Sequence, residues 1–493
     1  MLAREARRPA LPADACTARR RALIGAAASA FAASVPLAWL WGFTVDDALI
    51  SARVASRIAQ GLGHRYDRGG PVVDAVTPLG FAYLLAPFAR RGALAAFYFA
   101  KWFGASLSVA TAAWLGARTA KEAGGASRLS ILVPVALCAP LAAWCGAGME
   151  TGIVVALSTL SLGASRIAPL AAGLAAAWRP ELVPWSIALT VGRVLAASNE
   201  PGADGPRGRV DVRALTLAVT LGTLPAAVVA AVRVAAFGRP VPLAFFAKPS
   251  DFAHGVFYAV ASVLWTGAPM LVAAPWAIRR LDGQSRAILA AAAVHLGALV
   301  LAGGDWMAFF RLFVPVLPGL FLVGARLIAV ARPWASATRV LAASAVSATL
   351  LFTKGESARR VLGDRLALIR TATPALRAAR QVAALDIGWV GVATDADIVD
   401  LAGITDPSIA MLRGGHTSKR VPEGLLRHRH VDHLVLLADG PVDGGALADA
   451  PWARAVEARV AREAAELGFV LRATLEFSGE GLRYVVLTSK DEP

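Results

Sequence analysis

The chain has 493 residues, of which 57% are hydrophobic and 17% are charged, and its mean hydropathy is +0.57. Average soluble domains carry about 25% charged residues, so this composition excludes an ordinary soluble protein and favours a polytopic membrane protein. The formal net charge is +16, but many arginines fall in short loops between apolar runs, where positive charge is typical of the cytoplasmic side. We therefore expect no nucleic-acid partner. The three cysteines have no spacing typical of a disulfide framework or a zinc site.

The N-terminal residues 1–21 are basic and predict a cytoplasmic N-terminus. The apolar run that follows, residues 22–43, is longer than the ~7–15 residues of a signal-peptide core. We therefore expect an uncleaved first membrane span, with cleavage in this alanine-rich run as the alternative.

Residues 44–76 are too polar to span and predict the first outside loop. Its first part, from Asp46 to Gln60, has helical character. On a helical wheel Asp46, Arg53 and Arg57 share one side beside an apolar flank. This pattern predicts a helix that lies at the membrane interface.

The rest of the apolar region, up to residue 353, predicts a membrane domain over residues 22–353. The short run 79–88 has too few residues to cross, so we expect a re-entrant or interfacial helix there. Alternation of charge then predicts about eleven spans in all. The expected spans are residues 22–43, 92–116, 129–146, 152–164, 167–178, 182–197, 214–237, 254–278, 287–302, 312–330 and 337–352.

From residue 354 the composition changes, because residues 354–493 carry many charges and no spanning run. We expect a small α/β domain on the same outer side as the first loop. Its predicted elements are a helical stretch over residues 356–382 and strands at residues 387–392, 434–437, 471–477 and 484–487.

The adjacent carboxylates of Asp46 and Asp47 follow directly on the first span. A carboxylate fixed at the membrane boundary can act as general base toward an acceptor hydroxyl, and Arg53 and Arg57 lie on the side of Asp46, where they can keep it ionised and contact a substrate. Paired aspartates also suit a divalent cation. The alternative is a helix N-terminus that merely favours negative charge.

Further charged residues lie in the other expected outside loops. Arg179 can hold an anionic leaving group that Glu181 positions, or both can belong to an ordinary turn. Lys248 can bind a lipid phosphate or be an interfacial lysine. Asp305 and Arg311 can pair with each other or face one cavity.

Glu150 is a weaker candidate of the same kind. In the C-terminal region, His416 and Lys419 lie in a predicted loop from which they can reach the membrane site. The three histidines 428, 430 and 433 invite a metal site, but no cysteine or second pattern supports one.

Several short motifs together resemble the polytopic GT-C glycosyltransferases, and in particular the mycobacterial-type terminal β-(1→2)-arabinofuranosyltransferase group and its bacterial relatives. The opening motif runs from Asp46 to Arg53 and continues with Gly61 to His64. Later landmarks follow in the same order along most of the chain: residues 148–151, 179–181, 303–307 with Arg311, and 400–407. Residues 74–77 depart from the family, which usually has a glycine–aromatic pair there.

The resemblance implies a GT-C-like membrane domain in a bacterial plasma membrane. It also implies a polyprenyl-phosphate sugar as donor and inverting transfer to an extracytoplasmic glycan or lipid acceptor, with Asp46 or Asp47 as base. Two other classes remain open. One is a transporter or flippase of a lipid-linked substrate, which internal repeats with broken helices would mark. The other is a non-catalytic membrane protein whose outer domain docks a partner.

Overall fold

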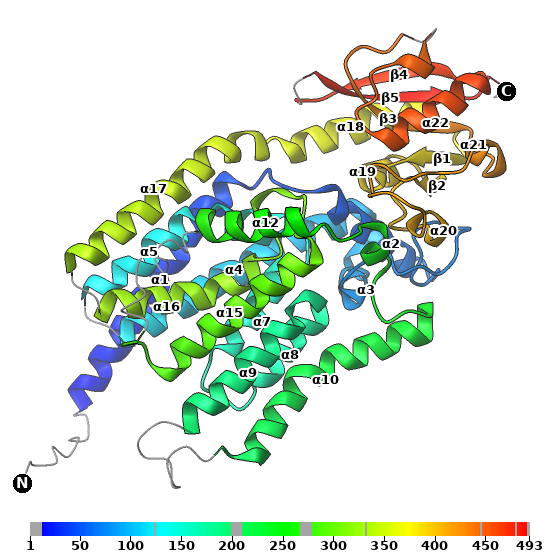
Figure 1. Ribbon diagram of the computed structural model, residues 1–493. Helices are drawn as coiled ribbons and strands as arrows, with labels where there is room; N and C mark the ends of the chain where they lie inside the picture. The colour runs from blue at the N-terminus through cyan, green and yellow to red at the C-terminus, as the bar shows by residue number, and fades with distance from the viewer. Residues whose placement is uncertain are drawn as a thin grey trace, which may run out of the picture.

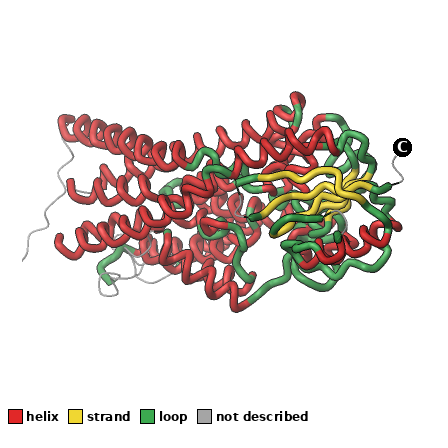
Figure 2. The backbone as a smooth tube through the Cα atoms, turned by 90° about the horizontal axis from the view of Figure 1, so that it is seen from above, coloured by secondary structure: helices red, strands yellow, loops and turns green. Residues whose placement is uncertain are grey.

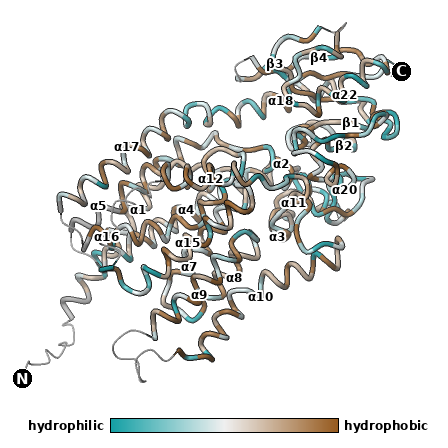
Figure 3. Tube along the Cα trace, in the orientation of Figure 1, coloured by the Kyte–Doolittle hydropathy of each residue, from teal (hydrophilic) through white to brown (hydrophobic). Residues whose placement is uncertain are grey.

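The computed structural model describes residues 12–122, 125–198, 210–266, 279–330, 333–443, 446–478 and 481–490. It consists of a long helical body with a small sheet domain at one end (Figures 1 and 2). Hydrophobic residues run along the helices of the body, whereas hydrophilic segments gather in the loops of the sheet domain (Figure 3). The predicted combination of a helical domain and a C-terminal α/β domain is therefore present.

The helical body combines long apolar helices with short helical turns that connect them. In chain order its elements are α1 (Pro12–Trp39), α2 (Asp46–Ala59), α3 (Leu79–Leu85), η1 (Phe88–Arg91), α4 (Ala93–Glu122), α5 (Gly125–Leu137), α6 (Ala139–Gly146), α7 (Thr151–Ser161), α8 (Ala168–Trp178), η2 (Pro180–Leu182), α9 (Val183–Ser198), α10 (Val212–Phe237), α11 (Leu243–Ala247), α12 (Phe252–Trp265), α15 (Gly283–Ala302), η3 (Ala308–Phe310), η4 (Val314–Val316), α16 (Leu317–Val330) and α17 (Pro333–Ala358).

Among the described residues, four helices are long and apolar enough to cross a membrane: Cys16–Trp39, Ala93–Ala120, Val212–Phe237 and Gly283–Ala302. In α10 only 11% of the apolar window is buried inside the protein, so most of its side chains need an apolar surrounding such as lipid. Shorter apolar helices lie within several other expected spans: Thr151–Ser161, Ala168–Trp178, Phe252–Trp265 and Val314–Ile328. The count of about eleven spans stays a prediction.

Two expected spans differ from the structure. The run 129–146 is divided at Cys138 into α5 and α6, because Pro140 has no N–H to continue the ladder and favours the start of a new helix. The run 254–278 is helical in α12, which ends at Trp265, and residues 267–278 lie outside the described part of the chain. The short α3 has seven residues, too few to cross, as predicted.

The sheet domain is built around one mixed sheet. Its elements are α18 (Val361–Ala375), β1 (Gln381–Ala384), α19 (Ile387–Ala393), β2 (Asp397–Asp400), α20 (Pro407–Ala410), α21 (Leu425–His428), β3 (His433–Asp439), η5 (Leu447–Asp449), α22 (Ala455–Glu466), β4 (Val470–Glu476) and β5 (Leu482–Thr488). The strand order is β2-β1-β3-β5-β4, with β1 parallel to β2 and β3, and β5 antiparallel to β3 and β4.

Alternation along β3 gives the sheet two buried faces. Val435 and Leu437 join the hydrophobic core of the helical body, whereas Leu434 and Leu436 pack in a separate core with α22. The sheet domain is therefore packed directly on the body. Helix α17 also crosses the predicted boundary at residue 353 and ends at Ala358, so the domains divide at the short turn before α18.

The strands predicted at residues 434–437, 471–477 and 484–487 are confirmed as β3, β4 and β5. The strand predicted at 387–392 is wrong, because this segment forms α19. The predicted helical stretch 356–382 is divided between the end of α17, α18 and the start of β1. Two of the first N–H groups of α19 donate to Asp46 in the distant α2, a contact that favours the helix and that the local sequence pattern does not reveal.

Candidate functional site

Helix α2 presents different residues to two cavities. Asp47, Ile50 and Ser51 line one cavity, at the boundary between the body and the sheet domain. Arg53 and Arg57 line another. Successive side chains on a helix are about 100° apart. Asp47 therefore lies on a different side of α2 from the predicted group of Asp46, Arg53 and Arg57.

The cavity at Asp47, called the aspartate cavity below, has a volume of about 90 Å³. Segments from all over the chain converge on it, including the loop before α3, the ends of α8 and α11, and one loop of the sheet domain. Its lining residues are Asp47, Ile50, Ser51, Ala75, Val76, Thr77, Pro78, Met149, Arg179, Ala244, Lys248, Arg311 and Ile404. The structure thus brings together residues from the separate motifs at 46–53, 179–181, 303–311 and 400–407.

The carboxylate of Asp47 lies between two cations. Its Oδ2 is 3.9 Å from Nζ of Lys248 and 3.7 Å from a terminal guanidinium nitrogen of Arg311. Both separations are longer than a hydrogen bond, and the Asp47 side chain is 25% exposed. The carboxylate is therefore oriented by charge while its oxygens stay able to accept a proton from a third group.

Arg311 is held by the loop that precedes it. It forms an ion pair of 2.9 Å with Asp305, so the predicted pairing is present. Of the two residues, Arg311 lines the aspartate cavity and Asp305 does not. Burial raises the pKa of Asp305, but Arg311 and Lys248 outweigh it and hold that pKa below its usual range. Phe309 and Phe310 adopt φ values of 61° and 53°, a left-handed conformation that is costly for bulky residues and that concentrates at functional sites.

Side chains from the body fix this strained loop. The indole N–H of Trp144 donates to the carbonyl of Ala308 at 3.0 Å, and the Tyr258 hydroxyl accepts the N–H of Leu312 at 3.0 Å. The ring of Phe309 packs edge-on against Phe43, which lies just before α2. The loop is therefore tied to the segment that carries Asp47.

Arg179 joins both candidate glutamates. Its guanidinium contacts Glu150 at 2.8 Å and Glu181 at 2.6 Å, and the Glu150 side chain is fully buried. Arg179 is extended (φ −137°) at the end of α8, as expected for a residue before proline. The two glutamates hold the guanidinium in place at the cavity wall and do not line the cavity themselves.

Asp46 has a different environment from Asp47. Its carboxylate accepts the N–H groups of Gly388 at 2.6 Å and Trp389 at 2.9 Å, which lie in the first turn of α19 and have no partner within that helix. Burial raises the pKa of Asp46, and Arg365 and these donors oppose the shift. Asp46 thus caps a helix of the sheet domain and is not among the residues that line the aspartate cavity. Its role as base stays a prediction.

Arg53 and Arg57 lie apart from the aspartate cavity. The buried guanidinium of Arg53 donates to the carbonyl groups of Tyr66, Gly391, Thr394 and Ala396 and pairs with Asp67. This network fastens the sheet domain to α2. Neither arginine lines the aspartate cavity, because their side of the helix is covered by α19 and the loop after it.

The two candidates from the sheet domain have separate roles. Lys419 is buried and donates to the carbonyl groups of Ala410 at 2.8 Å and Leu412 at 3.0 Å, so it holds its own loop and does not line the cavity. Burial and the nearby Lys248 lower the pKa of His416 to about 4, and the charge of Asp47 opposes this shift. The imidazole of His416 is therefore neutral near pH 7, and its pKa depends on the charges of Lys248 and Asp47.

The loop after β2 contributes Ile404 to the cavity. The buried carboxylate of Asp400 accepts the N–H groups of Ala402 at 2.9 Å and Thr405 at 2.6 Å, and Gly403 takes a φ of +80° that favours glycine. The tight loop lays Ile404 against the site, so this motif shapes the cavity with a side chain that carries no charge.

Sequence reasoning missed two buried cations that position the site. Lys101 in α4 donates to the carbonyl groups of Phe43, at 2.9 Å, and of Gly146, and thereby joins the segments before Asp47 and Glu150. Arg233 in α10 pairs with Asp74 at 2.7 Å and donates to the carbonyl of Thr77 at the cavity wall. Both lie alone in apolar runs, a pattern that is itself a signal of function or pairing.

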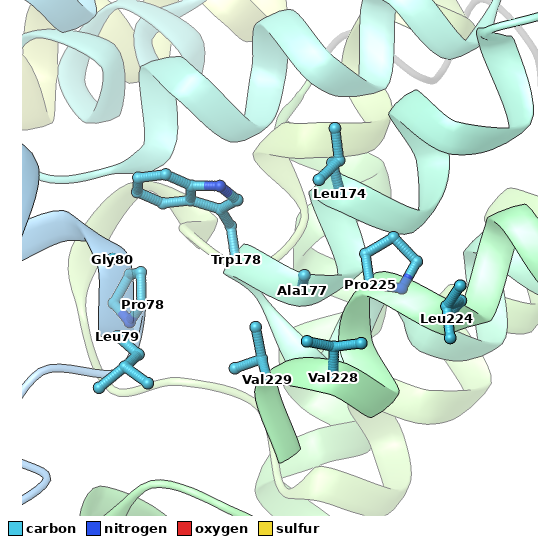
Figure 4. A pocket seen from close by; sticks show the side chains of 10 residues that line it. All are labelled: Pro78, Leu79, Gly80, Leu174, Ala177, Trp178, Leu224, Pro225, Val228 and Val229. Carbon is cyan, nitrogen blue, oxygen red and sulfur yellow. The ribbon is translucent and has the colours of Figure 1, made fainter. Parts of the chain in front are cut away.

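An apolar groove of about 440 Å³ shares one lining residue with the aspartate cavity, and Figure 4 shows the side chains that line the groove. It lies between α3, α8 and α10, and Pro78 lines both the groove and the cavity. Trp178 in the groove directly precedes Arg179 in the cavity. Its lining residues are Pro78, Leu79, Gly80, Leu174, Ala177, Trp178, Leu224, Pro225, Val228 and Val229.

A metal centre has no cluster of ligands in the part of the chain that the structure describes. No three His, Cys, Asp or Glu side chains gather there in a way that could hold an ion. The Asp47 carboxylate is instead within ion-pair distance of the cations Lys248 and Arg311.

Comparison with known proteins adds one match. Residues 357–482 match a family described as a domain of unknown function (DUF8728), a segment that contains α18 and most of the sheet. The comparison with curated proteins gave no match, and neither did the comparison with solved structures.

Proposed function

We propose that this protein is a GT-C-type glycosyltransferase that transfers a sugar, such as arabinofuranose or another pentose, from a polyprenyl-phosphate donor to an extracytoplasmic glycan or lipid acceptor. The observation that carries the proposal is the aspartate cavity, in which one carboxylate faces three cations next to an apolar groove. The order of short motifs along the chain supports the same class.

Asp47 is the proposed general base. It takes the proton of an acceptor hydroxyl, and the acceptor oxygen forms a bond to the anomeric carbon of the donor. The bond between that carbon and the phosphate oxygen breaks, and its electron pair leaves with polyprenyl phosphate, so the anomeric configuration inverts. Asp47 suits this role better than Asp46, because both oxygens of Asp46 already accept backbone N–H groups.

The cations of the cavity are the proposed binding groups for the leaving phosphate. A phosphate needs charge stabilisation rather than protonation as it departs. Arg179 and Arg311 are engaged with carboxylates at 2.6–2.9 Å, whereas the single ion pair of Lys248 among the described residues is the 3.9 Å contact with Asp47. Lys248 is therefore the cation most able to turn to an incoming phosphate.

The apolar groove is the proposed place for the first isoprene units of the donor. It offers an apolar wall on α8 and α10, and it reaches the polar cavity at Pro78. A lipid phosphate matches this arrangement, because its anionic phosphate is attached to the end of an apolar chain. The position of the groove next to the cavity, with Pro78 in the wall of both, therefore favours a lipid-linked donor over a soluble sugar nucleotide.

The proposed setting is a bacterial plasma membrane, with the N-terminus in the cytoplasm and the sheet domain outside. About eleven spans would place the first loop and the sheet domain on one side. The four long apolar helices and the exposed apolar surface of α10 support a membrane location.

The test uses the purified full-length chain in lipid with a panel of radiolabelled polyprenyl-phosphate sugars. The expected result is release of polyprenyl phosphate with one donor, lost in Asp47→Asn and retained in Asp449→Asn, an exposed aspartate of the sheet domain. Movement of an intact labelled lipid between leaflets without release would instead support a flippase. No turnover of any donor, with normal function of Asp47→Asn in a deletion strain, would overturn the enzymatic proposal.

A further inference from the structure

A second polar cavity, called the arginine pocket below, lies on the other side of α2 from Asp47. It has a volume of about 450 Å³ and opens between α2, η1 and the end of α19. Its lining residues are Arg53, Ser56, Arg57, Gln60, Arg68, Arg91, Gly92, Ala93, Leu94, Gly391, Val392, Ala393, Thr394 and Asp395. None of them lines the aspartate cavity, so this is a separate site.

The arginine pocket has more positive charge than its own carboxylate can balance. Arg57 is buried, with a side chain 3% exposed, and contacts Asp395 at 3.4 Å. The same carboxylate, which is 74% exposed, also forms an ion pair with Arg68 at 3.4 Å. Arg91 has no ion pair within the described part of the chain. One solvated carboxylate therefore faces three cations.

The surroundings of Arg57 make an added anion favourable. Burial and the neighbouring Arg53 lower its pKa, and Asp395 only partly offsets them. Ser56 and Gln60, one turn of α2 apart, add polar groups to the same wall. Guanidinium groups bind phosphate through parallel N–H donors, so the pocket has the charge and the kind of donor that a phosphate needs.

The arginine pocket also lies at the start of a candidate membrane span. Ala93 and Leu94 in its wall are the first residues of α4, and Ala93–Ala120 is one of the four helices able to cross a membrane. Phe88, in the same short element as Arg91, is exposed, as aromatic residues at the headgroup level often are. A phosphate bound here would sit at the depth of lipid headgroups.

We propose that the arginine pocket binds the headgroup phosphate of an anionic phospholipid. The site is independent of the glycosyltransferase proposal, because it shares no lining residue with the aspartate cavity. Bound lipid would bridge α2, η1 and the loop after α19, and would thereby help to hold the sheet domain on the body.

The test titrates the full-length protein in detergent with palmitoyl-oleoyl-phosphatidylglycerol and counts bound lipid by native mass spectrometry. The variant Arg68→Gln/Arg91→Gln removes two exposed cations of the pocket without touching the buried Arg57. Arg90→Gln is the matched control, since Arg90 is exposed in the same element but does not line the pocket. A parallel titration with inorganic phosphate separates a lipid source from a free one.

Binding of the lipid is expected to weaken about fivefold for each pocket arginine removed, and by less than about twofold in Arg90→Gln. Palmitoyl-oleoyl-phosphatidylcholine should bind more weakly in all three proteins. A different result would be that binding of inorganic phosphate depends on Arg68 and Arg91 whereas binding of the lipid does not. The pocket would then be a phosphate site, and the proposal that its ligand is a phospholipid would be overturned. If the double variant and Arg90→Gln behave alike toward both ligands, the proposal is overturned.

Discussion

Asp46 and Asp47 are consecutive residues whose carboxylates act in different parts of the molecule. Asp46 accepts the N–H groups of Gly388 and Trp389 in the sheet domain. Asp47 lies in a cavity with Lys248 and Arg311 at 3.9 Å and 3.7 Å. One residue therefore fastens the sheet domain to α2, and the other is available for chemistry.

The capping role of Asp46 predicts a local loss of stability in Asp46→Ala. The variant leaves two N–H groups of α19 without an acceptor, which should cost about 1–2 kcal/mol. Hydrogen exchange at Gly388 and Trp389 should become faster, whereas exchange in α22, on the far face of the sheet, should change little. Unchanged exchange at these two amides would contradict the capping role.

The cation at Lys248 predicts weaker phosphate binding in Lys248→Gln. Inhibition by the product polyprenyl phosphate should weaken, and turnover should fall by about 10–100-fold, because one charge that stabilises the leaving group is lost. Lys248→Arg should recover most of the inhibition. If product inhibition is the same in Lys248→Gln and the wild type, Lys248 does not bind the phosphate.

The pair between Arg311 and Asp305 predicts a stability effect that a second substitution can reverse. The side chains are 11% and 7% exposed, so Arg311→Gln leaves a buried carboxylate without its partner, at a cost of about 3 kcal/mol. The double variant Asp305→Asn/Arg311→Gln should be more stable than the single one in thermal unfolding, yet remain inactive. Additive destabilisation of the two substitutions would argue against the pair.

His416 predicts a pH dependence of stability below neutrality. Its pKa is about 4 in the folded protein and about 6.5 in an unfolded chain, so the unfolded state binds more protons between these values. Stability should therefore fall as the pH drops from about 6.5 toward 4, and His416→Gln should lack this part of the loss. Melting temperatures of both proteins measured across this range test it, and parallel curves would contradict it.

The apolar groove predicts a dependence on the length of the donor lipid. Val228→Trp should fill the groove and reduce turnover of a long-chain polyprenyl donor about tenfold, with less effect on a short-chain analogue. Val234→Trp is the control, because Val234 is also exposed on α10 but does not line the groove. Equal loss with both donor lengths would show that the groove does not hold the donor lipid.

Much of the architecture could be predicted from the sequence, because the length of an apolar run and the alternation of apolar and polar residues are properties of a local segment. The helix expected from Asp46 to Gln60 is α2, and three of the four expected strands are present. Asp47, Arg179, Lys248 and Arg311, which the sequence analysis selects as candidates in separate loops, line one cavity.

The remaining features depend on partners that are distant in the chain. Residues 387–392 have the composition of a strand, but Asp46 supplies the acceptor that starts a helix there. The roles of Asp46 and Asp47 cannot be separated by a helical wheel, because the wheel does not say which face meets the sheet domain. Lys101 and Arg233 are visible in the sequence as lone charges in apolar runs, and the same principle that selects Arg179 applies to them.

The most direct test of Asp47 as the base compares the turnover of Asp47→Asn and Asp46→Asn with one active polyprenyl-phosphate donor, in lipid and at matched amounts of folded protein. We expect Asp47→Asn to lose at least about a hundredfold in turnover with an unchanged melting temperature. Asp46→Asn should lower the melting temperature and keep most of its turnover. Full activity in Asp47→Asn, or a selective loss of chemistry in a stably folded Asp46→Asn, would contradict the assignment of Asp47 as the base.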